Sequence, residues 1–386
     1  MKIAILKKPY CIEIEDQNLK NNLNSDEIRA KTIVSALKLG TDRGNYEGAE
    51  DVPGAPTYPR WVGDSNIAVV EEVGSDVKEF KVGDRVVSQN PHQSEWIAKE
   101  STNICVVPDG VKNEDAVWST LYTLSGFCYT KADFIPGENV AVVGLGILGL
   151  GAIGLGPLYG AKNTIAIGNS EVRNEMAKKM GADHAVLSNS ETLEEELNEL
   201  TNNEGVDLVI LTANPWDAYV SSLRSVRPDG RISIVALSGR GEEDRAFNPF
   251  PMEYFYNKGI SIIAVSGNFG YKYPNDDRFS WKNRCSSVLS FMNKKQLNPS
   301  ILKTHRMIHL CDMCTFRQHP GSPENSTCVD FSFPGQSGAF PEGCKTTCKM
   351  ILLLYQNCPG AGILISSNAG GIAFCVIAAR PSAPFV

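Results

Sequence analysis

The sequence has no excess of positive charge. Its 386 residues include 37 lysines and arginines against 44 aspartates and glutamates, which gives a formal net charge of −7 at pH 7. A net negative surface repels polyanions, so we expect no nucleic-acid partner. The 42% hydrophobic and 21% charged composition is ordinary for a soluble globular protein.

The start of the sequence does not follow the pattern of a secretory leader, so we expect none. Met1–Leu6 is a short apolar run that is followed at once by Lys7 and Lys8, whereas a leader places its basic residues before a longer apolar stretch. We therefore interpret Met1–Leu6 as a first β-strand. The expected location is cytoplasmic, without a membrane partner.

Cysteine is scarce through most of the sequence. Of the 11 cysteines, the four that precede His305 are few enough to be reduced, buried thiols of a cytosolic protein. The others crowd the end of the chain. The four early residues are Cys11, Cys105, Cys128 and Cys285, and the late ones are Cys311, Cys314, Cys328, Cys344, Cys348, Cys358 and Cys375.

Two patterns of secondary structure follow one another along the chain. Up to about Asp109, short β runs alternate with turn residues, as in Ile67–Val73, Asp84–Val87 and Trp96–Ala98, which is typical of a β-barrel. From about Lys112, a helical stretch precedes alternating strands and helices, which predict a parallel sheet with helices on both faces and a ligand crevice at the carboxyl ends of the strands. The expected strands are 139–143, 164–168, 183–187, 206–212, 231–237 and 260–266, and the expected helices are 114–131, 148–159, 171–180, 193–201 and 215–226.

A glycine turn is the most informative motif. The β-branched run Val140–Val143 leads into Gly144, Gly146 and Gly149, and a long apolar stretch follows. In such a strand–turn–helix unit the first glycine permits the bend, the second lets the backbone approach a pyrophosphate and the third lets the helix pack closely. The alternative is a packing turn without a ligand. The predicted cofactor-binding residues are Gly144, Leu145, Gly146, Ile147, Leu148 and Gly149.

Several further stretches, in the same order along the chain, make it resemble the medium-chain dehydrogenase/reductase superfamily of alcohol dehydrogenase-like enzymes. The resemblance implies an α/β protein in which a GroES-like β-barrel domain is joined to a Rossmann doubly wound parallel-sheet domain. It also implies an NAD(P)-dependent oxidoreductase that transfers hydride between nicotinamide and a small-molecule alcohol, carbonyl or activated alkene. The resembling stretches are Gly40–Asp42, Val69–Gly74, Phe80–Val86, Pro136–Gly137, the glycine turn, Met180–Asp183 and Pro228–Arg231.

On this resemblance we divide the chain into four parts. Residues 1–115 are the expected barrel domain, 116–270 the nucleotide-binding domain, 271–307 a segment that returns to the barrel, and 308–386 a divergent cysteine-rich tail. If the tail replaces the closing segment of the family, the barrel lacks an edge strand. Relatives of this type are usually dimers or tetramers, so we expect a homodimer or homotetramer.

The family's zinc pattern is not matched. By spacing, Leu39, Asp64 and Ser119 stand where many members hold the catalytic metal, and a zinc site needs at least three good donors. Leucine cannot ligate a metal and serine is a poor zinc ligand. The segment Val87–Trp96 contains no cysteine, so the family's structural zinc lobe is missing too. The chain resembles the zinc-free members, and we expect no metal.

Without a Lewis acid, protein groups must handle the substrate's proton. Thr41 matches the hydroxyl that passes this proton to solvent in the zinc enzymes, and its alternative is a turn residue that bonds the backbone. His92 is a candidate acid–base residue, and its alternative is an ordinary surface histidine. Thr123 lies by spacing where a family threonine approaches the nicotinamide.

The second strand of the parallel sheet carries no carboxylate at its tip. An NAD-binding site usually has an Asp or Glu there to accept the ribose 2′-OH, whereas this strand ends in Gly168, Asn169 and Ser170. Glycine leaves volume for a 2′-phosphate, Asn169 and Ser170 offer donors, and Arg173 can pair with the phosphate. We expect NADP(H) on these grounds. Glu171 is the counter-argument, since it can accept the 2′-OH or help to cap a helix.

The tail allows three interpretations. It is a divergent end without an evolved fold, a metal knuckle built from Cys311, Cys314, Cys344 and Cys348, or a membrane-associated segment formed by the uncharged run 350–379. For the whole chain, the main hypothesis is a zinc-independent NADP(H) oxidoreductase acting on an alcohol/carbonyl pair. The alternatives are a reductase of activated alkenes or quinones and a catalytically inactive nucleotide-binding redox sensor.

Overall fold

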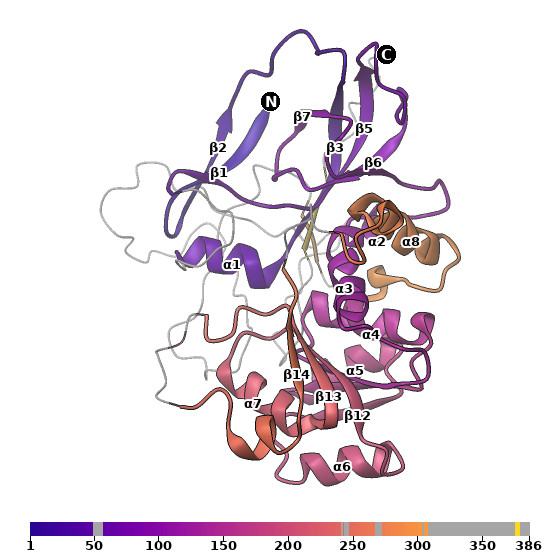
Figure 1. Ribbon diagram of the computed structural model, residues 1–386. Helices are drawn as coiled ribbons and strands as arrows, with labels where there is room; N and C mark the ends of the chain where they lie inside the picture. Colours follow the sequence, from indigo (N-terminus) through magenta and orange to yellow (C-terminus); the bar gives the residue numbers. More distant parts are fainter. Residues whose placement is uncertain are drawn as a thin grey trace, which may run out of the picture. The chain divides into compact units, whose positions relative to one another are not determined.

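The computed structural model describes residues 1–48, 57–240, 242, 247–266 and 272–302, with the backbone alone at 39, 40, 43, 47, 305–307 and 375–378. The chain divides into two compact units, Met1–Trp118 with Leu302–Val386 and Ser119–Ile301. We call them the barrel unit and the nucleotide unit and describe each by itself (Figure 1). The segment expected to return to the barrel enters that unit from Leu302.

The barrel unit is built of antiparallel strands around β3 (Glu27–Leu37), which pairs with β5 (Asn66–Val73) and β7 (Glu95–Lys99). Alternating side chains of these strands form an apolar core that includes Ile28, Val70 and Trp96. The sheet continues through β6 (Arg85–Ser88) to β8 (Ile104–Val106), and a second sheet has the order β2 (Cys11–Asp16), β1 (Lys2–Lys8), β4 (Arg60–Trp61). The predicted β runs are thus found with boundary shifts of one or two residues.

One edge of the barrel sheet departs from expectation. β16 (Cys375–Ala378) pairs antiparallel with the Val34–Leu37 end of β3, and β15 (His305–Met307) pairs parallel with β16. The expected loss of an edge strand is therefore wrong, because backbone groups of the tail supply the missing pairing. The proposed cysteine knuckle and most of the uncharged run lie outside the described residues.

The nucleotide unit contains six parallel strands in the order β11, β10, β9, β12, β13, β14. The first three strands are added toward one edge of the sheet and the last three toward the other, so the strand order reverses between β9 and β12. This is the switch point where doubly wound sheets bind ligands. This arrangement confirms the predicted fold class. The strands are β9 (Asn139–Val143), β10 (Asn163–Gly168), β11 (His184–Leu187), β12 (Val206–Leu211), β13 (Val226–Ile234) and β14 (Ser261–Ala264).

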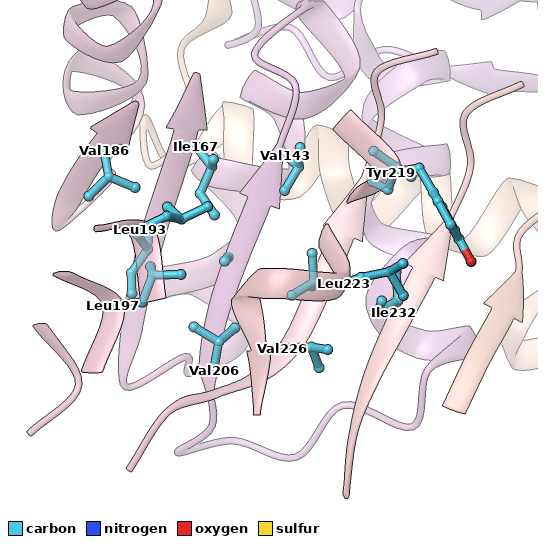
Figure 2. Packing of buried hydrophobic residues seen from close by; sticks show 14 of the residues in the cluster. Val143, Ile167, Val186, Leu193, Leu197, Val206, Tyr219, Leu223, Val226 and Ile232 are labelled. Atoms are coloured by element: carbon cyan, nitrogen blue, oxygen red, sulfur yellow. The ribbon is translucent and has the colours of Figure 1, made fainter. Parts of the chain in front are cut away.

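Helices cover this sheet. Leucines of α6 (Leu193–Leu200) and α7 (Trp216–Ser225) pack on valines and isoleucines of the strands, as Figure 2 shows. α4 (Ile147–Tyr159) packs against α3 (Ser119–Lys131) and α5 (Glu171–Met180). Because β9 is buried along its whole length, the strand end that carries the glycine turn is held firmly.

Some helices were not foreseen. The predicted helix over 114–131 is two helices, α2 (Asn113–Ala116) and α3, and α8 (Trp281–Asn293) closes the nucleotide unit. α1 (Leu39–Glu47) follows β3 directly, although Gly40 and Gly44 disfavour a helix. Within the described ranges, no helix is long and apolar enough to span a membrane. The four cysteines before His305 are buried.

Candidate functional site

The glycine turn lies at the carboxyl end of β9, beside the switch point. Gly144 has φ 94°, in the left-handed region that favours glycine, and a Cβ there would lie 2.5 Å from the Ala213 Cβ. Its carbonyl oxygen accepts a 2.7 Å hydrogen bond from the Thr212 hydroxyl, which follows β12. The two strand ends on either side of the switch point are thereby tied together.

The other two glycines of the turn have different surroundings. A Cβ on Gly149 would overlap the carbonyl oxygen of Gly144, so this glycine is needed for close packing of α4 on β9. A Cβ on Gly146 would meet no atom within 4 Å, so the space over this residue is open. Gly146 is also the N-cap of α4 and supplies no side-chain cap. Open space beside uncapped amides at the positive end of a helix fits a diphosphate.

The tip of β10 is arranged differently from our expectation. The volume that a Cβ of Gly168 would need is occupied by the Asn174 amide oxygen and, at 2.8 Å, by a methyl group of Leu145. The idea that Gly168 leaves room for a 2′-phosphate is therefore wrong, since the glycine accommodates helix packing instead. Asn169 is exposed at this tip.

The first turn of α5 carries the remaining predicted nucleotide contacts. Ser170 is the N-cap of α5, but its hydroxyl makes no cap hydrogen bond, and Glu171 is exposed. Arg173 reaches back to the glycine turn and donates a 3.5 Å hydrogen bond to the Leu145 carbonyl. Burial lowers the pKa of Arg173, yet a guanidinium remains charged at neutral pH. A cation thus lies beside the predicted phosphate site.

Thr123 and Ser119 lie on α3 and are buried. The Thr123 hydroxyl donates a 2.7 Å hydrogen bond to the Ser119 carbonyl, so its proton is committed within the helix and only its lone pairs can meet a ligand. The Ser119 hydroxyl oxygen accepts a 3.6 Å hydrogen bond from the Cys285 thiol. Both side chains are thus engaged inside the nucleotide unit.

The barrel unit contains a second group of interest, which we call the charged cluster: Lys38, Asp42, Asp64 and His92. Lys38 is 5% exposed, and its ammonium group contacts the Asp64 carboxylate. Asp64 connects the cluster to solvent, because its side chain is 32% exposed. A buried lysine beside a partly exposed carboxylate is the feature that sequence reasoning missed.

Backbone contacts hold the cluster in place. Lys38 follows β3 and is the N-cap of α1. Its amide donates to the Asp42 carboxylate over 2.6 Å, and the Asp42 amide donates a 2.8 Å hydrogen bond to the Lys38 carbonyl. The loop that carries Asp64 is fixed to β3 because the Ser65 carbonyl accepts from the Ala36 amide over 3.0 Å. The end of β3, the start of α1 and the loop with Asp64 are thus bonded to one another, which restricts the positions of these side chains.

His92 lies behind the charged pair. It is fully buried, so the alternative of a surface histidine is wrong. Its Nδ1 is 2.6 Å from the Ser35 hydroxyl oxygen, and that hydroxyl donates to the Ser65 carbonyl over 3.0 Å. Because that hydroxyl proton is already used, Nδ1 donates to the Ser35 oxygen. The other ring nitrogen, Nε2, lies 3.9 Å from an Asp42 carboxylate oxygen. His92 therefore contacts Ser35 on one side and faces Asp42 on the other.

Burial and charge shift two of these groups. Burial lowers the pKa of Lys38 to about 8, although the Asp42 carboxylate opposes the change. Burial would raise the pKa of Asp42, but the His92 imidazole and Lys38 together hold it below its usual value. Asp42 therefore stays ionised at neutral pH, while Lys38 can change its charge near physiological pH.

Thr41 lies in the first turn of α1. Its amide donates a 3.1 Å hydrogen bond to the Lys38 carbonyl, and the residue is half-buried. Its hydroxyl remains a candidate for proton transfer.

The donor set does not fit a catalytic zinc ion. Leu39 has no donor atom, and Asp64 is already engaged by the Lys38 ammonium, which would repel a divalent cation at the same place. Across the side chains that the structure describes, no group of three or more His, Cys, Asp and Glu residues could hold a metal. One signal in the sequence could have revealed the cluster: a lysine that directly follows an apolar strand and is separated from Gly40-Thr41-Asp42 only by Leu39.

Comparison with known proteins gives consistent matches in both units. Residues 27–141 match the family model "Alcohol dehydrogenase GroES-like domain", and residues 148–281 match "Zinc-binding dehydrogenase". Sorbitol dehydrogenase of Bacillus subtilis is 26% identical, covering 76% of this chain and 98% of the relative. NADP-dependent isopropanol dehydrogenase of Thermoanaerobacter brockii is 30% identical, covering 63% of this chain and 76% of the relative. Among solved structures, galactitol-1-phosphate dehydrogenase of Escherichia coli superposes with a TM-score of 0.68 at 19% identity, covering 80% of this chain and 93% of that one.

Proposed function

Because the chain belongs to the medium-chain dehydrogenase/reductase superfamily and is an NAD(P)-dependent oxidoreductase, we propose that it interconverts an alcohol and a carbonyl compound with NADP(H) and without zinc. The observation that carries the proposal is the Lys38–Asp64 ion pair, which takes the place of a metal's donor set. Relatives in this superfamily bind small molecules. The nucleotide site that we propose for this chain is the glycine turn.

The residues of the turn would hold the cofactor by its diphosphate. The open face over Gly146 admits the phosphates, and the uncapped amides of Ile147 and Leu148 at the start of α4 bind them. Bound NADP(H) supplies or accepts a hydride at C4 of its nicotinamide. Thr123 can offer only an acceptor to the cofactor, because its hydroxyl proton bonds the Ser119 carbonyl.

The preference for NADP(H) rests on the first turn of α5. No carboxylate ends β10, the Ser170 hydroxyl makes no cap bond, and the Arg173 guanidinium lies beside the glycine turn. A guanidinium pairs strongly with a phosphate and gains little from a 2′-hydroxyl. One relative is also named as NADP-dependent. Glu171 supports the NAD(H) alternative, and its exposed carboxylate is available to either ribose.

A binding comparison tests this preference. We expect Arg173→Ala to weaken NADPH binding by about 10- to 100-fold while leaving NADH almost unchanged, because a charge-assisted hydrogen bond contributes about 1.5–3 kcal/mol. Fluorescence titration of both nucleotides gives the two dissociation constants. Lys179→Ala is the matched control, since Lys179 is an exposed cation of the same helix. An unchanged NADPH:NADH ratio in Arg173→Ala would remove this residue from the site.

A turnover screen tests the reaction class. Purified protein is given NADPH with butanal, 2-butanone, an enone or a quinone, and NADP+ with the matching alcohols. We expect turnover of an alcohol/carbonyl pair. Activity confined to enones or quinones would favour the alkene-reductase alternative, and NADPH binding without any turnover would favour the inactive redox sensor.

Two coarser features complete the proposal. We propose a homodimer or homotetramer, as is usual for this superfamily, which light scattering of the purified protein measures directly. The proposed location is the cytoplasm, where thiols stay reduced, in keeping with the few, buried cysteines of the described barrel and nucleotide units. Fluorescence microscopy of a tagged chain tests the location.

A further inference from the structure

We propose that Lys38 is the acid–base residue of the reaction and supplies, in place of a metal ion, the positive charge that holds the substrate oxygen. The inference rests on the proposed alcohol/carbonyl function and deepens it. It follows from the position of the ammonium group, its partners and its burial.

Burial of Lys38 calls for an explanation. A buried ion pair is commonly no more stabilising than apolar residues of similar size, because desolvation offsets the attraction between the charges. Lys38 directly follows β3, whose last residues Ala36 and Leu37 are buried and apolar, and its side chain is 6% exposed. If only the stability of the fold mattered, an apolar residue at this position would serve as well. A buried cation at the sequence position next to Leu39, where the family pattern starts its metal site, serves the chemistry instead.

The ammonium group has hydrogen-bonding capacity to spare. It carries three N–H donors, and within the described residues Asp64 engages it. The charged groups that face it are Asp64 from the loop after β4 and Asp42 from α1, with His92 behind Asp42. Two N–H groups thus remain for a carbonyl or alkoxide oxygen, and no basic group other than this imidazole faces the ammonium within the cluster.

The step balances as follows. In reduction, the carbonyl carbon accepts a hydride with its electron pair, the C=O π pair moves to oxygen, and Lys38 gives that oxygen one proton to form the alcohol. Lys38 is left as a neutral amine and regains a proton from water beside Asp64, the exposed edge of the cluster. In oxidation the neutral amine removes the hydroxyl proton as the carbon loses hydride. Oriented charge of this kind is worth most in a site that excludes water.

The pH dependence has a definite sign. Lys38 must be protonated for reduction and neutral for oxidation, and its pKa is lowered to about 8. Reduction should therefore be fast below pH 8 and slow above it, whereas oxidation should rise as the pH passes through 8. Asp42 and His92 contribute by keeping a fixed negative charge behind the ammonium. Asp64→Asn removes a neighbouring negative charge, so it should move both limbs to lower pH.

The test compares four variants of the full chain with two measurements. One is the pH profile of kcat/KM for butanal reduction, and the other is binding of propionamide to the protein–NADPH complex. Propionamide presents a carbonyl oxygen but accepts no hydride, so its binding is read without turnover. The variants are Lys38→Met, Lys38→Arg, Asp64→Asn and the control Lys31→Met, whose lysine is exposed on the same strand β3.

We expect Lys38→Met to lose about 100-fold or more in kcat/KM and about tenfold in propionamide affinity, the usual effects of removing an acid and a charged donor. Lys38→Arg should keep propionamide binding but lose the rate and the limb near pH 8, because arginine holds its proton. Lys31→Met should behave as wild type. NADPH affinity and circular dichroism report whether each variant is folded.

A folded Lys38→Met protein with wild-type rate and propionamide affinity would overturn the role of Lys38 but not the proposed function. If Lys38→Met does not fold, Asp64→Asn decides, and an unchanged pH profile in that variant overturns the role of Lys38. Wild-type protein that binds NADPH but turns over no carbonyl refutes the proposed function. In that case, propionamide binding still tests whether the charge of Lys38 holds an oxygen ligand. Equal binding in wild type and Lys38→Arg, with loss in Lys38→Met, supports this role, and equal binding in all three proteins contradicts it.

Discussion

At the scale of single residues, the three glycines of the turn have distinct roles. Gly144 and Gly149 are required by neighbouring backbone and side-chain atoms, whereas Gly146 borders open space and has a φ of −77° that any residue adopts. The sequence motif predicts all three positions because their spacing follows from strand, turn and helix geometry. It does not show which glycine serves the ligand and which serves the fold.

This difference can be measured. Gly146→Ala should change the free energy of unfolding by no more than about 1 kcal/mol, since its Cβ meets no atom. It should nevertheless weaken NADPH binding about tenfold or more, because the methyl group enters the space of the diphosphate. Chemical denaturation and fluorescence titration give both values.

Gly149→Ala provides the contrasting variant. Its Cβ would overlap the Gly144 carbonyl oxygen, so we expect a loss of about 2 kcal/mol in unfolding free energy from overpacking. Equal stability of the two variants, or normal NADPH affinity in Gly146→Ala, would contradict the assignment of the open face to the phosphates.

The charged cluster could be predicted only in part. Thr41 and His92 were recognised as candidates from residue type, and Asp64 from its place in the zinc pattern. Lys38 was not, because its burial depends on contacts with Asp64, which lies 26 positions further along the chain. Spacing along a sequence carries no information about such long-range packing.

At the scale of elements, the apolar strands were the most predictable. β9, β10 and β12 are mostly apolar because both faces of a parallel sheet are covered, and their boundaries agree with the prediction to within one residue. The end of α7 was less clear. A helix was predicted through Val226, but β13 begins at that residue, directly after Ser225.

A lysine stabilises this abrupt junction. The Lys258 ammonium donates hydrogen bonds to the carbonyls of Leu223, Arg224 and Val226 at 3.0, 3.0 and 2.7 Å. Carbonyls at the end of a helix otherwise lack partners, and a cation there also interacts favourably with the helix dipole. A contact from a residue so far along the chain could not be foreseen from the local pattern.

We expect Lys258→Met to lower the free energy of unfolding by about 1–3 kcal/mol, the usual contribution of hydrogen bonds to a charged group. Urea denaturation of the full chain measures the change. Lys179→Met, at an exposed lysine on α5, should be neutral. Equal stability of the two variants would show that the junction needs no cap.

At the scale of the whole molecule, fold class and superfamily could be predicted because many short motifs occur in one order along the chain. Both family models and the six-stranded order confirm them. The zinc pattern departs from the same family at Leu39 and Asp64, and the structure adds a buried lysine, Lys38, in contact with Asp64. The tail was the least predictable part, and its strand β16 pairs through backbone groups that no side-chain pattern reveals.

The most direct test of this account measures metal content and activity on the same sample. Full-length protein is purified without chelator, its zinc is determined by mass spectrometry, and NADPH-dependent reduction of the best carbonyl is assayed before and after dialysis against a strong chelator. The account predicts zinc far below one atom per chain and an unchanged rate after dialysis, because Lys38 supplies the charge. Zinc near one atom per chain, with activity that is lost on chelation and restored by zinc, would contradict it.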